Sequence, residues 1–147
     1  MGYIPYRQMG YSTLLFLHVT AAFTMVAAVG LFLAIALALR SDRHSASALR
    51  LAPAAGVLWA VGGLAVIVFG VWLALHDSQY SLGDGWIIAA ILLWVVGSAI
   101  GGRIASGYRR LASAGASPVP VPLVMNLALV VTVLVILIDM IYKPGAS

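Results

Sequence analysis

The three histidines are the residues of this chain best suited to bind a metal or a cofactor, and His18 lies inside a long apolar segment. That segment, LFLHVTAAFTMVAAVGLFLAIALALR, contains no acidic residue, and its only arginine or lysine is the terminal Arg40. Burying an ionisable side chain in such a segment costs free energy unless a partner or a cavity compensates. The presence of a histidine there therefore indicates a functional site. We therefore take His18 as the first candidate ligand.

The residues on the same helical face as His18 are small or soft. Side chains three or four positions apart share a face of a helix, which groups His18 with Ala21, Ala22 and Met25. Small side chains let a neighbouring helix or a flat macrocycle come close. Met25 is two turns away from His18 along the helix, so the two side chains cannot both bind one haem iron as its axial ligands. Two axial donors lie roughly 4 Å apart, twice a metal–nitrogen bond of about 2.0–2.1 Å.

A second ligand has to come from another helix. His76 ends the second apolar segment and is the natural partner of His18, so the sequence predicts this pair as ligands of a haem iron or of copper. Asp139, in the last apolar segment, is a candidate to accept a hydrogen bond from a ligating imidazole. His44 stands in a charged stretch and is expected to be solvated.

Each of these residues has a structural alternative. His18 could instead be hydrogen-bonded to a neighbouring helix, as polar side chains are in membrane bundles. His76 is stable at a membrane interface without a ligand, and Asp139 could pair with Lys143, four residues further along the helix.

The composition indicates a membrane protein. The 147 residues are 63% hydrophobic and 8% charged, whereas about a quarter of the residues of an average soluble chain are charged. The net charge of +4 is typical of membrane topology and of contact with anionic headgroups, so we expect the lipid bilayer as a partner and no nucleic acid. The absence of cysteine excludes disulfides, iron–sulfur clusters and covalently attached haem.

Four apolar segments are each long enough to cross a bilayer, which takes about 20 residues. We therefore predict an all-α fold, a polytopic membrane protein that forms one up-down bundle of four transmembrane helices over residues 1–147. The predicted spans are residues 12–39, 54–75, 86–105 and 123–142.

Counting lysines and arginines predicts the orientation. Six arginines fall in the first and third connections, against Arg7 and Lys143 near the two termini. This asymmetry places both termini outside the bacterial cytoplasmic membrane. It also places His18, His76 and Asp139 towards the outer face.

Glycines at GxxxG spacing predict close helix packing. Gly97 and Gly101 form such a pair on the third span, and Gly70 with Ala74 forms a similar pair on the second. The pattern fits packing within one chain. It fits equally well a homo-oligomer or a membrane-complex partner that binds the Gly97 and Gly101 face.

Short motifs along nearly the whole chain carry a family resemblance. LFLHV, GVWLALH, YSLGDGW and MIYKP together resemble a family of small bacterial integral membrane proteins. That family is related to the copper-resistance D proteins and to the four-helix, haem-binding protoporphyrinogen oxidases. The resemblance implies a four-helix bundle in which the first-helix histidine, His18, is a ligand of haem b or of a metal.

Three functions remain open from the sequence. The first is non-covalent binding of haem b in membrane redox chemistry or electron transfer. The second is a non-enzymatic accessory or scaffold subunit of a membrane complex. The third is copper handling by His18 and His76 with the thioether of Met9 or Met140. The sequence does not decide whether the protein is an enzyme.

Overall fold

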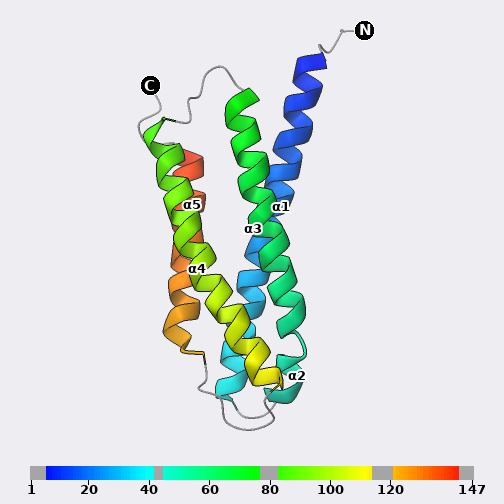
Figure 1. Cartoon of the computed structure of the whole chain (residues 1–147), viewed down its shortest axis with the longest axis vertical. Coiled ribbons are helices and arrows are strands. Elements are labelled where there is room, and N and C mark those ends of the chain that lie inside the picture. The colour runs from blue at the N-terminus through cyan, green and yellow to red at the C-terminus, as the bar shows by residue number, and fades with distance from the viewer. Residues whose placement is uncertain (1–5, 42–44, 77–82, 114–120, 143–147) are drawn as a thin grey trace.

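The structure is a computed structural model that describes residues 6–41, 45–76, 83–113 and 121–142, with the side chains of residues 6–9 and 45 left out. Four long helices run alternately up and down and form one bundle (Figure 1). The predicted all-α, four-helix architecture is therefore confirmed. The helices are α1 (Tyr6–Arg40), α2 (Ser45–Leu49), α3 (Ala52–His76), α4 (Gly85–Ser113) and α5 (Leu123–Tyr142).

The helix boundaries differ from the predicted spans mainly at polar ends. Helix α4 continues to Ser113, well past the predicted end at residue 105, because its small and basic residues are compatible with a helix even where they leave the apolar zone. The connection between the first two predicted spans contains the short helix α2. Pro53 lies in the first turn of α3, where a missing N–H costs no helical hydrogen bond.

The four long helices have the length and hydropathy of membrane spans, and large apolar side chains are exposed on all of them. Because soluble monomers rarely expose so much continuous apolar surface, this surface fits a lipid environment. The protein is thus a multi-pass membrane protein.

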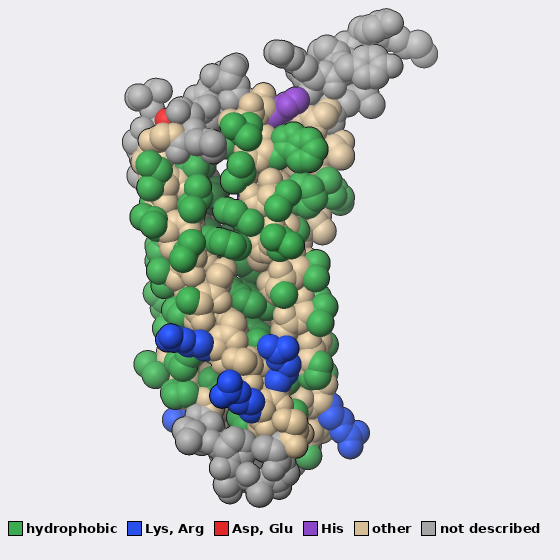
Figure 2. Space-filling view, viewed as in Figure 1, with side chains coloured by type: hydrophobic (Ala, Val, Ile, Leu, Met, Phe, Trp, Pro, Cys, Tyr) green, Lys and Arg blue, Asp and Glu red, His purple; other side chains and the backbone are tan. Residues whose placement is uncertain are grey.

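The two ends of the bundle differ in charge. We call one the arginine end, because blue side chains gather near it on the face that Figure 2 shows. The opposite end, where α1 begins and α5 finishes, is called the terminal end. Which end faces the cytoplasm stays a prediction from the charge asymmetry. The arginines with described, exposed side chains at the arginine end are Arg40, Arg50, Arg103, Arg109 and Arg110.

Helices α1 and α3 pack together through bare backbone. A Cβ atom on Gly62 of α3 would lie 2.9 Å from the backbone nitrogen of Met25 and 3.2 Å from the carbonyl oxygen of Ala21. Any side chain at this position would therefore push the two helices apart. Close approach at small residues is the main source of packing between helices in lipid, which is as apolar as a protein core.

The half of the bundle next to the arginine end holds the larger core. Phe32, Trp59 and Tyr108 meet there, with ring centroids 6.4 Å apart for Phe32 and Trp59 and 6.1 Å apart for Phe32 and Tyr108. Gly101 lies directly under the Trp59 indole, and Gly97 is close to Thr132 of α5. Both glycines are buried, so their face packs within the chain.

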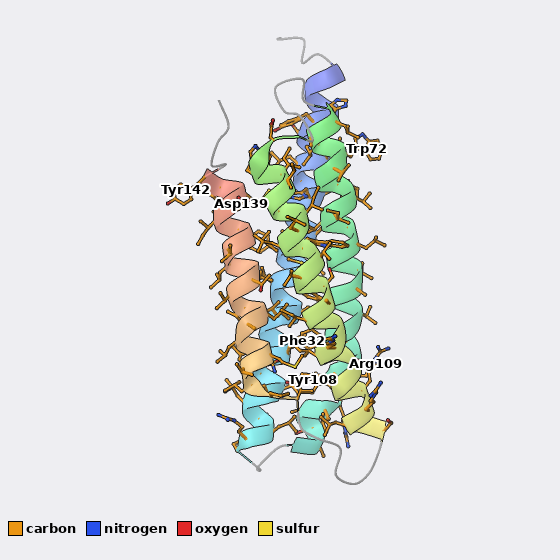
Figure 3. The ribbon with its side chains drawn as sticks, turned by 60° about the vertical axis from the view of Figure 1, so that its left-hand side comes forward. Phe32, Trp72, Tyr108, Arg109, Asp139 and Tyr142 are labelled. Atoms are coloured by element: carbon orange, nitrogen blue, oxygen red, sulfur yellow. The ribbon has the colours of Figure 1, made fainter. Side chains whose placement is uncertain are left out.

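Towards the terminal end the bundle opens. Helices α1 and α5 approach each other near the arginine end and diverge from it, as Figures 1 and 3 both show. A second, smaller core of Ala74, Trp86 and Ile87 joins α3 to α4 near the terminal end. The space between the two cores is the site described next.

Candidate functional site: an apolar cavity beside His18

A cavity of about 520 Å³ lies between α1, α3, α4 and α5 in the terminal half of the bundle. Met25 of the larger core contributes to its wall at the arginine side. Ala74, Trp86 and Ile87 line it towards the terminal end, together with Met140. The volume falls within the range of about 300–1,000 Å³ that is usual for ligand sites.

The walls are almost wholly apolar. No aspartate, glutamate, lysine or arginine of the described residues lines the cavity, and its polar side-chain groups belong to Tyr11, His18 and two tryptophans. The Trp94 indole N–H is already used, because it donates to the Gly63 carbonyl at 3.0 Å. Among the described lining residues, the His18 imidazole is thus the one strong ligand-binding group in an apolar pocket.

Helix α3 holds one nitrogen of the His18 ring. Nδ1 lies 3.1 Å from the carbonyl oxygen of Val66. A carbonyl oxygen can only accept a hydrogen bond, so Nδ1 carries the proton and Nε2 keeps its lone pair. Metal-binding histidines are commonly held in this way, with the second ring nitrogen donating to a backbone carbonyl or a carboxylate.

Gly70 makes room for this ring. A Cβ atom at Gly70 would lie 3.0 Å from Cε1 and 3.3 Å from Nδ1 of His18. The imidazole therefore lies against bare backbone of α3, one turn from the Val66 carbonyl that it binds. The predicted small pair on this helix, Gly70 with Ala74, serves the site as well as the packing, because both residues line the cavity.

The structure does not bring His76 to His18. The His76 side chain is exposed at the end of α3, and its Nε2 lies 4.0 Å from the Cβ position of Gly10. Gly10 precedes His18 by eight residues, or about 12 Å along the helix. Two axial ligands of one iron must lie far closer than this, so the two histidines do not form an axial pair here. His44 lies outside the described residues.

Asp139 is buried at the terminal end of α5, where Figure 3 labels it, but it is not part of the cavity wall. Its Oδ2 atom is buried and has no hydrogen-bond partner among the described residues. The acceptor for the His18 N–H is the Val66 carbonyl rather than this carboxylate. The alternative partner, Lys143, lies outside the described part of the chain.

The predicted pocket face of α1 is only partly used by the cavity. Ala22 and Met25 line it, whereas Ala21 packs against Gly62 of α3 instead. Of the two methionines considered as soft ligands, Met140 lines the cavity. The side chain of Met9 lies outside the described residues.

Sequence reasoning missed a buried polar pair in the larger core. The Tyr108 hydroxyl lies 3.3 Å from Asn126 Oδ1 and 3.4 Å from the Phe32 carbonyl oxygen. Tyr108 lies beyond the predicted end of the third span at residue 105, and Asn126 was not among the predicted site residues. Both Asn126 and Asp139 are in fact buried on α5. The available signal was the presence of these two polar residues in an otherwise apolar helix.

In the described residues no three His, Asp or Glu side chains gather in a metal-binding group. Fold and site together define a small multi-pass membrane protein with an internal apolar cavity and one imidazole on its wall. The sequence matches no protein-family model, no curated protein and no solved structure.

Proposed function

We propose that the protein binds haem b in this cavity, with His18 Nε2 as an axial ligand, and serves membrane redox chemistry or electron transfer. The observation that carries the proposal is the hydrogen bond from His18 Nδ1 to the Val66 carbonyl. It fixes the tautomer that leaves Nε2 free to bind a metal. The sequence resemblance given above points to the same residue.

The walls fit an apolar macrocycle. The described lining residues carry no charge, and Trp86 and Trp94 offer flat aromatic faces. Met140 of α5 lines the same cavity, and its thioether is a soft donor that would be available to haem iron beside histidine. No described lysine or arginine lines the cavity, so the cofactor carboxylates would have to be solvated at the terminal end.

Haem held in this way would supply one-electron transfer. The chain's own part would be to bind and orient the group through His18 and to keep water away from it. Among the described residues, copper would find His18 and two thioethers, of Met25 and Met140, on the cavity wall. The predicted copper site had two imidazoles, of His18 and His76, whereas this wall provides one. We therefore do not propose copper.

An optical spectrum of protein produced with ample haem tests the proposal. We expect intense visible bands from the wild-type protein and their loss in His18→Ala. His76→Ala is the matched control and should keep the bands, because His76 lies at the surface beside Gly10. A colourless wild-type protein, or full bands in His18→Ala, would contradict haem ligation and favour an accessory subunit.

A further inference from the structure

The cavity lies between two helix pairs that separate in only one half of the molecule. Helices α1 and α3 stay in contact through Gly62, and α4 packs along α5. Helices α1 and α5, in contrast, diverge towards the terminal end (Figures 1 and 3). The terminal half of the bundle is therefore open on the side between α1 and α5.

The exposure of the wall residues locates the opening. Val19 and Phe23 of α1 line the cavity and are 42% and 71% exposed, and Ile141 of α5 lines it and is 73% exposed. A side chain that both lines a cavity and reaches the surface stands at its mouth. On α3 and α4, by contrast, every cavity residue is buried or half-buried.

The route from the aqueous phase at the terminal end is narrower. Ala74 of α3 packs with Trp86 and Ile87 of α4, and all three are buried. Met140 of α5 packs against the same cluster. These side chains narrow the space at the terminal end between α3, α4 and α5. The mouth between α1 and α5, in contrast, lies within the membrane-spanning part of both helices.

We infer that the cavity has a lateral portal to the bilayer between α1 and α5, and that its ligand enters from the lipid rather than from water. The rim is formed by Val19 and Phe23 on one side and Ile141 on the other. The uncharged walls suit a ligand that dissolves in lipid. The identity of that ligand as haem b rests on the proposed function, whereas the portal does not.

Quenching of tryptophan fluorescence by brominated acyl chains tests the portal without any haem. In a Trp72→Phe, Trp86→Phe background, the remaining indoles are Trp94 on the cavity wall and Trp59 in the larger core. We expect vesicles of brominated phosphatidylcholine to quench this protein, and most of the quenching to disappear when Trp94 is also replaced by phenylalanine.

A matched pair of substitutions locates the mouth. Val19→Phe adds bulk at the rim, whereas Val131→Phe adds the same bulk on an exposed part of α5 away from the cavity. We expect Trp94 quenching to fall in Val19→Phe only. Equal quenching in the two variants would overturn a portal between α1 and α5, and quenching of Trp94 no stronger than that of Trp59 would overturn any opening to lipid.

Haem transfer from phosphatidylcholine vesicles then tests the ligand. We expect Val19→Phe to slow transfer about tenfold relative to Val131→Phe, which corresponds to about 1.4 kcal/mol in the access barrier. The final visible spectrum in detergent should be unchanged. If no variant takes up haem but Trp94 is still quenched through the portal, the haem proposal fails and the portal stands. Equal transfer rates with unequal quenching would overturn the portal as the route of the ligand.

Discussion

At the scale of single residues, the site depends on backbone groups of α3 more than on side chains. The Val66 carbonyl accepts a hydrogen bond from His18 Nδ1–H, and Gly70 leaves the space that the ring occupies. Both act by holding the imidazole in one orientation. Neither residue has a side chain that can bind a metal, so both are positioning residues.

Replacing Gly70 tests this positioning role. The Cβ of Gly70→Ala would lie 3.0 Å from His18 Cε1, closer than nearly all real contacts, so the ring must turn or shift. We expect displaced visible bands or weakened haem retention, measured by spectroscopy. Gly30→Ala on α1 is the control, because nothing lies within 4 Å of its Cβ position. Unchanged bands in Gly70→Ala would show that the ring does not depend on this glycine.

The buried pair of Tyr108 and Asn126 gives a second residue-scale prediction. Tyr108→Phe removes the hydroxyl that lies 3.3 Å from Asn126 Oδ1 and leaves that oxygen without this partner. We expect a loss of about 1 kcal/mol in the free energy of unfolding. Thermal unfolding in detergent measures it. Tyr142→Phe, at a 77% exposed position, should change nothing. Equal stability of the two variants would mean that the buried contact contributes nothing.

The sequence predicted part of this site and missed part for identifiable reasons. Helical periodicity grouped His18 with Met25 on one face of the first span, and both residues line the cavity. The partner of His18 is a backbone carbonyl, and since every residue has one, no residue type could reveal it. The predicted pairing of His18 with His76 was based only on their similar depth in the membrane. Depth does not show the direction of a side chain at a helix end, and His76 points towards Gly10.

At the scale of helices, GxxxG spacing predicted close packing but not its partner. Gly97 and Gly101 share a face of α4, yet one approaches Thr132 of α5 and the other Trp59 of α3. The motif here serves contacts with two different helices of the same chain. Its spacing alone could not distinguish this from contact between copies, because both require the same small residues.

Neighbouring glycines on α4 provide a matched test of this packing. A Cβ in Gly101→Ala would overlap the Trp59 indole, whereas Gly102→Ala meets nothing within 4 Å. We expect Gly101→Ala to cost about 1–3 kcal/mol, as overpacking does. Gly102→Ala should be neutral or stabilising by up to about 1 kcal/mol. Thermal unfolding in detergent compares them, and a Gly101→Ala variant as stable as Gly102→Ala would argue against a tight contact with Trp59.

At the scale of the whole molecule, the fold class followed from the sequence because four long apolar segments without strand-like alternation allow few alternatives. The wedge shape of the bundle did not follow from it. The divergence of α1 and α5 depends on where aromatic rings hold the helices together and where glycines let two backbones approach. Phe32, Trp59 and Tyr108 fill the arginine half, while Gly62 and Gly70 keep α1 against α3 beyond it. Composition cannot reveal such pairings.

Orientation in the membrane is the remaining whole-molecule prediction. The chain has no cysteine, so an introduced thiol is the only one present. Ser113→Cys lies at the arginine end of α4 and Gly85→Cys at its terminal end, and both positions are exposed. With both termini outside, we expect a membrane-impermeant thiol reagent to label intact cells at position 85 and not at position 113. The opposite pattern would reverse the predicted topology.

The four long helices differ in length, and this has a consequence for the thickness of membrane that suits the protein. Helix α5 has 20 residues and a length of about 30 Å, close to the thickness of a typical hydrocarbon core, whereas α1 with 35 residues is about 52 Å long. The longer helix can tilt or project from the surface. Because α5 is the shortest of the four over the described residues, the mismatch in a thicker bilayer falls first on this helix, which carries Met140 and one side of the cavity mouth.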